Sequence, residues 1–173
     1  MALGRSSLEA GPENADDPQV ERDFYAQFMR QHPRTSVAEM KREFDKKRAC
    51  WEAHRTIQQL STLGRRVEYM AADVTDREQV ANVIREVVSK YGRIDLLVYG
   101  AGVQVSTRLE NRRLAEFRRT FSVKVGGLRN LTEECRSQLG KTVPTHVLTS
   151  AYSIFGNDGQ HDYGAANETL DRL

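Results

Sequence analysis

The strongest constraint on the fold is an alternation, in the second part of the sequence, between short apolar runs and amphipathic helical patterns. Val67–Ala71, Ile94–Tyr99 and His146–Thr149 have strand character. Ile94–Tyr99 is almost entirely apolar, which is typical of a buried parallel strand. Strand–helix–strand alternation with short turns predicts a parallel sheet covered by helices, and so an α/β fold.

The helices between these runs are marked by caps and turn residues. Asp76–Gln79 is a helix cap, and Gly92 ends the apolar helical face that follows it. A polar helix is predicted over Leu114–Gln138, and Gly156–Gly159 is a turn before a helix that begins near Tyr163. Each predicted strand is therefore followed by a predicted helix.

Residues 1–62 have a different character, because they are polar, charged and without strand signals. Met1–Pro18 carries Gly, Pro, Asp, Glu and Asn, which predicts a loop or a disordered lead. Val20–Arg30 is compatible with a short helix, and the capping box at Ser36–Glu39 opens a longer one. This part is predicted to be a helical insertion before the sheet.

Composition excludes several classes of function. The formal net charge is +2 with 29% charged residues, so no bulk electrostatic argument favours nucleic-acid or membrane binding. No apolar run approaches the roughly 20 residues of a membrane span, and no signal segment is seen, so a cytoplasmic protein is expected. The four His and two Cys residues have no ligand spacing, and no metal site is predicted.

Four side chains suggest a proton-transfer site. Tyr163 and Asn167 are spaced i, i+4 on one helix face, Ser150 follows a strand at the ligand-facing edge, and Lys124 lies on the preceding helix. A tyrosine phenol titrates near pH 10 unless a nearby cation favours the phenolate, and Lys124 is a candidate for that cation. Each residue alone also fits a plain structural role: packing, backbone bonding or solvation. Their joint order favours reduction of a carbonyl, with hydride from a nicotinamide.

Several blocks of sequence resemble one family in order and spacing. They resemble the ketoreductase domains of type I polyketide and related fatty-acid synthases, in the short-chain dehydrogenase/reductase superfamily. The resemblance covers residues 64–173 nearly continuously, so the domain is predicted over 63–173. It implies a Rossmann-type fold and reduction of a β-ketoacyl group, held on an acyl carrier protein, by NADPH. The blocks are Gly64–Asp76, Ile94–Val103, Phe117–Gly127, Val147–Gly156 and Gly159–Asn167.

The resemblance also implies a role for each site residue. Tyr163 matches the proton donor and Ser150 the hydroxyl that orients the carbonyl. Lys124 and Asn167 match the other two active-site positions. Ordinary short-chain dehydrogenases have the Lys where Asn167 stands, so the exchange favours the synthase domains over free-standing relatives.

The resemblance assigns the cofactor contacts to strand ends. Asp73 and Val74 match the residues that bracket the adenine. Gly100, Ala101 and Gly102 match the turn against the nucleoside. This Gly-Ala-Gly lacks the later glycine of a G-x-G-x-x-G motif, so it is not the pyrophosphate loop.

The start of the chain is informative in the same way. Leu3–Ser6 resembles the end of the second strand, where Arg5 and Ser6 match the residues that meet the 2′-phosphate of NADPH. The two residues also fit a solvated terminus. If the match holds, the first strand, the glycine-rich loop and the first helix lie upstream of this chain, and its end lies inside the helix of Tyr163. We then expect an incomplete Rossmann-type sheet flanked by helices, and weak NADPH binding.

Two outcomes for the sheet follow from that expectation, and two functions stay open. Either the sheet has a gap between the strands at Val67–Ala71 and Ile94–Tyr99, or these two strands pair directly. The chain is either the reductase portion of a synthase, working with an acyl carrier protein and other synthase domains, or a catalytically incompetent structural or interaction fragment of one. The inserted helical segment resembles that of iterative synthases of the polyunsaturated fatty-acid or enediyne kind. Its basic clusters, Lys41-Arg42 and Lys46–Arg48, fit either an acidic carrier protein or a solvated helix face.

Overall fold

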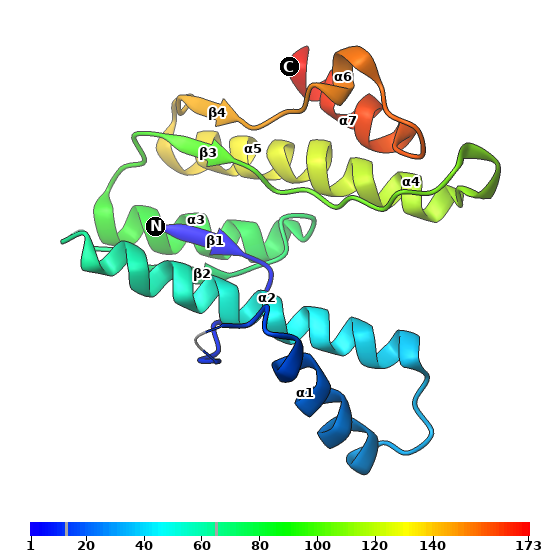
Figure 1. The fold of residues 1–173 in the computed structure, drawn as a ribbon. Coiled ribbons are helices and arrows are strands. Elements are labelled where there is room, and N and C mark those ends of the chain that lie inside the picture. Colours follow the sequence, from blue (N-terminus) through cyan, green and yellow to red (C-terminus); the bar gives the residue numbers. More distant parts are fainter. Residues whose placement is uncertain (13, 65) are drawn as a thin grey trace. The chain divides into compact units, whose positions relative to one another are not determined.

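The computed structural model describes residues 1–12, 14–64 and 66–173, which form two compact units, Met1–Ala71 and Ala72–Leu173 (Figure 1). Residue 13 of the predicted lead and residue 65 of the family-like region lie outside the described residues. This division follows from the contacts within each unit and is not a test of domain boundaries. The domain boundary drawn after residue 62 therefore stays a prediction. Each unit is described by itself.

The first unit contains a two-stranded parallel sheet. Strand β1 (Ala2–Gly4) pairs with β2 (Tyr69–Ala71), with Leu3 opposite Met70. The prediction of a loop over Met1–Pro18 is therefore wrong at β1, whereas the resemblance of this segment to a strand end is confirmed. β2 is shorter than the predicted Val67–Ala71 because only its last three residues pair.

Two helices follow β1, as predicted. Asp17 caps α1 (Pro18–Gln31) by accepting a hydrogen bond from the Gln19 amide, and Pro18 stands in the first turn, where its missing N–H costs nothing. The Ser36–Glu39 capping box opens α2 (Val37–Thr62), with both of its reciprocal bonds formed. The predicted start at Ser36 is confirmed, whereas α1 begins at Pro18, two residues before the predicted Val20 and inside the segment predicted as a loop.

The second unit also contains a two-stranded parallel sheet. Strand β3 (Leu97–Tyr99) pairs with β4 (Thr145–Val147), with Val98 opposite His146. The expectation of full burial for Ile94–Tyr99 is wrong, because Val98 is 60% exposed whereas Tyr99 is 2% exposed. Side chains alternate between the faces of a strand, so only one face of this pair is covered.

The sheet of the second unit is flanked by helices (Figure 1). The predicted helices at Asp76–Gly92 and near Tyr163 are confirmed, but the predicted helix over Leu114–Gln138 is interrupted by a wider π turn, and a short helix before Gly156 was not predicted. The helical elements are α3 (Arg77–Tyr91), η1 (Leu109–Asn111), α4 (Leu114–Phe121), η2 (Ser122–Gly126), α5 (Gly127–Leu139), α6 (Tyr152–Phe155) and α7 (His161–Asp171).

The core of the second unit lies where α3 and α5 pack on each other. Apolar side chains from both helices are buried there, at the i, i+3 and i+4 spacing of a helix face. They are Val80, Val83, Ile84, Leu128, Leu131 and Cys135.

The strands of the chain fall into separate sheets. Among the described residues β2 pairs with β1 and β3 pairs with β4, and no pairing joins β2 to β3. Of the two outcomes foreseen for the sheet, direct pairing of these strands is therefore not found among the described residues. In the described ranges, no helix combines the length and the apolar character needed to cross a bilayer.

Candidate active site

The carboxyl ends of β3 and β4 lie at the same edge of their sheet, because the two strands are parallel and in register. Gly100 and Gly102 follow β3, and Leu148 to Ser150 follow β4. Ligands of parallel α/β sheets bind at this edge. A cavity of about 240 Å³ lies there and is lined by Gly100, Gly102, Val103, Gln104, Lys124, Leu148, Thr149 and Tyr163.

Lys124 reaches this cavity from the π turn η2. Its side chain is buried, with 3% of the residue exposed, and its ammonium nitrogen lies 3.4 Å from the Leu148 carbonyl oxygen, to which it donates. π turns inside helices occur often at functional sites, because the extra residue changes which side chain faces inward. The wider turn is held from the strand side, where the Tyr99 hydroxyl donates to the Val123 carbonyl.

Gly102 gives Lys124 the room to lie against the strand end. A β-carbon at residue 102 would stand 3.2 Å from Cε of Lys124, which is tighter than ordinary packing. The glycine of the Gly100–Gly102 turn therefore serves the lysine side chain, in addition to any role toward a cofactor.

The ring of Tyr163 lies beside the ammonium group of Lys124. The Nζ atom of Lys124 is 5.1 Å from the centroid of the Tyr163 ring, within the range of a cation–π contact. The Tyr152 ring meets the same ring edge-on at 6.5 Å. The pairing of Lys124 with Tyr163, expected from their order in the sequence, is thus present in the structure.

Asp171 is a charged neighbour of Lys124 that the sequence reasoning missed. Burial lowers the pKa of Lys124, and the negative charge of Asp171 opposes this shift. Hydrogen bonds from the side chains of Ser153 and Thr149 hold the pKa of Asp171 below its usual value. The signal was available, because Asp171 stands two i, i+4 steps after Tyr163 on the same helix face.

Ser150 and Asn167 do not line the cavity. Ser150 is half-buried, and its Oγ accepts a hydrogen bond from the Tyr152 amide at 3.3 Å. Asn167 is fully buried and its Nδ2 donates to the Tyr163 carbonyl at 2.7 Å, while its Oδ1 has no hydrogen-bond partner among the described residues. Asn167 thus contacts the backbone of Tyr163 and braces the helix.

The residues proposed to bracket the adenine, Asp73 and Val74, lie in the second unit just before α3. Oδ1 of Asp73 accepts from the amide and hydroxyl of Thr75, and the Val74 carbonyl accepts from Nδ2 of Asn130 at 2.9 Å. Ala101 is half-buried and, like Asp73 and Val74, lies outside the cavity lining. Their cofactor contacts stay predictions.

Arg5 and Ser6 belong to the first unit, directly after β1. Arg5 is exposed, and the Ser6 carbonyl accepts a hydrogen bond from the Tyr69 hydroxyl. Their proposed contact with a 2′-phosphate also stays a prediction.

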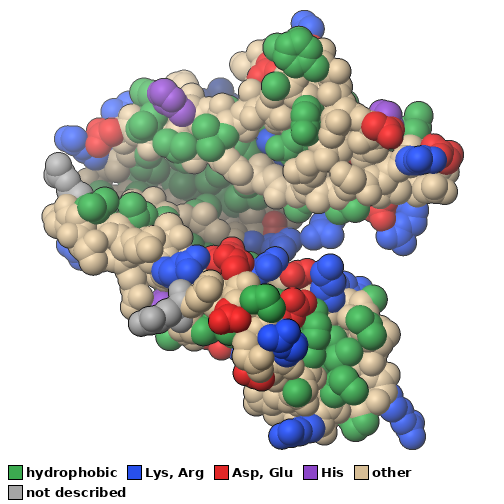
Figure 2. All heavy atoms as spheres, viewed as in Figure 1, with side chains coloured by type: hydrophobic (Ala, Val, Ile, Leu, Met, Phe, Trp, Pro, Cys, Tyr) green, Lys and Arg blue, Asp and Glu red, His purple; other side chains and the backbone are tan. Residues whose placement is uncertain are grey.

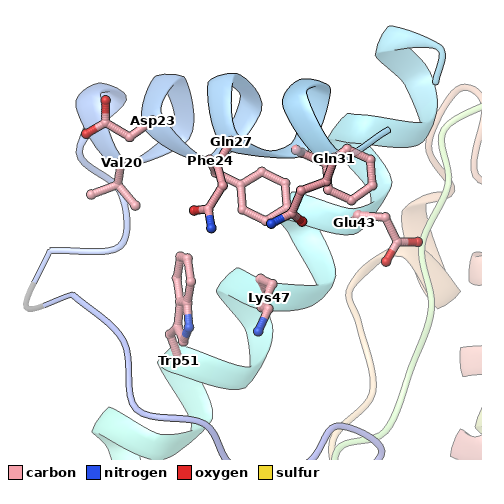
Figure 3. Close-up of a pocket in the computed structure, with 9 residues that line it drawn as sticks. Val20, Asp23, Phe24, Gln27, Gln31, Glu43, Lys47 and Trp51 are labelled. Carbon is pink, nitrogen blue, oxygen red and sulfur yellow. The ribbon is translucent and has the colours of Figure 1, made fainter. Parts of the chain in front are cut away.

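A larger cavity, of about 580 Å³, lies between α1 and α2 of the first unit. Figure 3 shows Phe24 of α1 and Trp51 of α2 facing this space, with Lys47 and Glu43 on the α2 side. Lys47 already pairs with Glu9. We assign the active site to the smaller cavity, because it holds the buried lysine and the phenol at a strand edge.

The basic clusters of α2 are mostly neutralised within the first unit. Arg42, Lys46 and Lys47 pair with Glu39, Glu43 and Glu9, and Arg48 pairs with acidic neighbours. Figure 2 shows Lys and Arg intermixed with Asp and Glu over the visible face. This pattern favours a solvated helix face over a basic surface for an acidic carrier protein.

Comparison with known proteins gives one family. The sequence profile described as "KR domain" matches residues 24–173. Polyketide synthase GfsA of Streptomyces halstedii is 34% identical over 121 residues, covering 70% of this chain and 2% of that protein. The 3-oxoacyl-[acyl-carrier-protein] reductase FabG of Thermotoga maritima is 30% identical over 112 residues, covering 64% of this chain and 46% of that protein. A polyunsaturated fatty acid synthase of Thraustochytrium sp. is 31% identical over 124 residues, covering 70% of this chain and 4% of that protein.

Among solved structures, the chain resembles an aldohexose dehydrogenase of Thermoplasma acidophilum in its ligand-free form. The TM-score is 0.57 at 20% identity, covering 61% of this chain and 42% of that one. This likeness confirms the predicted α/β, Rossmann-type fold. The chain spans less than half the length of each of these relatives.

Proposed function

The chain belongs to the KR domain family, the ketoreductases of the short-chain dehydrogenase/reductase superfamily, and from this premise we propose that it supplies the proton-transfer half of a ketoreductase site. The proposed reaction is NADPH-dependent reduction of a β-ketoacyl thioester, carried by an acyl carrier protein, to the β-hydroxyacyl form. It takes place within a polyketide or fatty-acid synthase, with the other synthase domains as partners.

One observation carries the proposal: a buried lysine ammonium lies over the ring of a half-buried tyrosine, in a cavity at the carboxyl edge of two parallel strands. Burial of a charge costs free energy, and such groups are common where proton transfer needs them. The proposed proton donor is the Tyr163 hydroxyl, which gives its proton to the ketone oxygen. Lys124 favours the phenolate that remains, through its positive charge.

Two further residues act on the same oxygen or on the donor. The Ser150 hydroxyl is proposed to donate a hydrogen bond to the ketone oxygen and orient it. Asn167 is proposed to hold the Tyr163 segment through the Tyr163 carbonyl, which its Nδ2 contacts at 2.7 Å. Together they fix the distance over which the proton moves.

The exposed Gly100 and Gly102 fit the nucleoside of a nicotinamide cofactor, because a bare backbone at a strand end leaves room for a flat ring system. A bound nicotinamide would supply the hydride, which no side chain can. The sequence of 173 residues contains no G-x-G-x-x-G pattern, so we expect this chain alone to hold NADPH weakly.

The test is product formation from a β-ketobutyryl thioester at high NADPH concentration, followed by mass spectrometry over long incubations. With cofactor deuterated at the transferred position, we expect slow formation of a heavier hydroxyacyl product. Tyr163→Phe should lower the rate by about 10²–10⁴-fold, the range for loss of a general acid. Tyr152→Phe, whose ring packs against Tyr163, is the matched control and should retain the rate.

Equal rates for the wild type and Tyr163→Phe would reject the assigned proton donor. Absence of the product from a folded wild-type chain would favour the alternative, a structural or interaction fragment of a synthase.

A further inference from the structure

A buried ion pair lies directly before Tyr163 in the second unit. The Nη2 atom of Arg112 is 3.2 Å from Oδ1 of Asp162, and the two side chains are 4% and 2% exposed. Arg112 lies between η1 and α4, and Asp162 stands in the first turn of α7, where the helix dipole favours a negative charge. The pair therefore joins the connection after β3 to the start of the helix that carries Tyr163.

Such a pair is weak evidence for stability. Removing two charges from water costs much of what their attraction returns, and apolar side chains of similar size often serve as well. The Nε and Nη1 atoms of Arg112 and the Oδ1 atom of Asp162 are buried without a hydrogen-bond partner among the described residues, so the two side chains are held by charge and not by a hydrogen bond, which adds to the cost. A role in placing neighbouring groups explains the pair better than a gain in stability.

Arg112 also ties two loops together. Its Nη2 atom donates to the Val105 carbonyl at 2.6 Å and to the Gly159 carbonyl at 2.8 Å. The same Gly159 carbonyl accepts from the Thr107 amide at 2.9 Å. Gly159 has φ of +71° and a β-carbon there would stand 3.2 Å from the Thr107 nitrogen, so the two backbones approach as closely as a glycine allows.

Asp162 extends the connection to the helix of Lys124. Its second carboxylate oxygen accepts a hydrogen bond from the Thr120 hydroxyl at 2.7 Å, and Thr120 is buried in α4. α4 continues directly into the π turn, so Thr120 stands one helical turn before Lys124. The Asp162 carboxylate thus contacts the helix that leads into the π turn of Lys124, and Asp162 directly precedes Tyr163 in the sequence.

We propose that Arg112 and Asp162 form a clasp that holds Tyr163 beneath Lys124, and that both are positioning residues of the ketoreductase site. The proposal rests on the proposed function, because it takes the lysine–tyrosine pair as the working part. Neither residue needs to touch the substrate. The clasp sets the relative place of the two elements whose side chains must meet at 5.1 Å.

The test is ¹⁹F NMR of the full chain labelled with 3-fluorotyrosine. The Tyr163 resonance is assigned by its loss in Tyr163→Phe, and the resonance of Tyr69, in the other unit, serves as the internal reference. Arg112→Met and Asp162→Asn break the clasp from either side. Arg113→Met is the matched control, because Arg113 and Arg112 both pair with Glu116, but the Arg113 side chain is 79% exposed and that of Arg112 only 4%.

We expect Arg112→Met and Asp162→Asn to shift the Tyr163 resonance or split it into several lines, as the ammonium no longer stays over the ring. Arg112→Lys keeps the charge and should recover part of the wild-type shift. Arg113→Met should leave both resonances in place. This readout uses neither substrate nor cofactor, so it fails or succeeds independently of the reductase assay.

Arg112→Met and Asp162→Asn each leave one buried charge without its partner and can fail to fold. In that case two other variants test the proposal. Thr120→Val keeps the ion pair but cuts the link to α4, and Arg112→Met with Asp162→Leu replaces the pair by apolar side chains. Both should shift the Tyr163 resonance in a folded chain. An unchanged Tyr163 resonance in every folded variant would overturn the proposal and leave the pair a structural contact only.

Discussion

The two units of this chain bury different kinds of side chain. Among the described residues, the buried side chains of the first unit are apolar, namely Ala15, Met40 and Phe44. The buried polar or charged residues of the described ranges lie in the second unit, namely Thr120, Lys124, Gln160, Asp162 and Asn167, and so does the Arg112 side chain, which is 4% exposed. Burial of such groups is unfavourable unless they are paired, so their concentration sets the second unit apart and agrees with the active site proposed there.

The interactions within the first unit are mainly contacts between aromatic side chains and exposed ion pairs. Phe24 stacks on Phe28 at 5.6 Å and meets Phe44 at 5.3 Å, which closes the contact of α1 with α2. Its ion pairs are exposed, and exposed pairs contribute about 0–1 kcal/mol each. This unit therefore has a small apolar core, and a change in that core should be felt within it.

The largest expected effect comes from emptying either core. Phe44→Ala should cost about 3–5 kcal/mol and Leu131→Ala about 2–5 kcal/mol, because each leaves a cavity at a side chain that is 2% or 3% exposed. Hydrogen exchange followed by peptide mass spectrometry would localise each loss. We expect faster exchange in residues 1–71 for the first variant and in residues 72–173 for the second.

Faster exchange throughout the chain in both variants would contradict the division into two units, because it would show that the whole chain unfolds as one cooperative unit. Val37→Ala is the control, because Val37 is 71% exposed and its loss should leave both patterns unchanged.

A smaller effect separates buried from exposed hydrogen bonds. Thr120→Val keeps the shape but removes the bond to the Asp162 carboxylate, which should cost about 1.5–3 kcal/mol. Thr56→Val is its match in the first unit, where the hydroxyl bonds the Glu52 carbonyl at an exposed position. That variant should stay within about 0.5 kcal/mol of wild type in denaturant unfolding. Equal costs would contradict the contrast between the units.

The smallest effect concerns Lys124 and depends on pH. Because burial lowers the pKa of Lys124, the folded chain binds this proton less tightly than the unfolded chain, whose lysine titrates near 10.5. The charge therefore costs stability at neutral pH, and this cost disappears as pH rises from the lowered value toward 10.5. We expect Lys124→Met to melt at a higher temperature than wild type at pH 7.

The difference in melting temperature should shrink steadily as the pH is raised. The gain stays modest, because the charge of Asp171 already offsets part of the burial cost. A difference that is constant across this range, or of opposite sign, would show that the ammonium is not held in an unfavourable place.

Much of the fold could be predicted from local signals. The predicted caps at Ser36 and Asp76 satisfy backbone groups within one helical turn, and each lies where the structure starts a helix. Burial of the strands could not be predicted in this way. Ile94–Tyr99 has the composition of a covered strand, but cover depends on neighbouring strands and helices, so Val98 is exposed.

The candidate site was also predicted only in part, because burial of charged side chains cannot be read from the sequence. Lys124 and Tyr163 were found from their order along the chain, and the structure brings them together. The Arg112–Asp162 pair was missed, because a single charged residue in a sequence with 29% charged residues carries no sign of burial. Asp171 is exposed, and only its spacing from Tyr163 pointed to it. Only tertiary packing shows which charges have left the water.

The wide turn at Ser122–Gly126 makes the position of the ammonium group depend on chain length as much as on side-chain type. Each residue of an ordinary helix advances by about 100° around its axis. Loss of one residue from this stretch would restore ordinary winding and rotate the whole of α5 by that angle relative to α4. The apolar stripe of α5 and the lysine would then face wrong directions together, so single-residue deletions there are expected to be far less tolerated than most replacements.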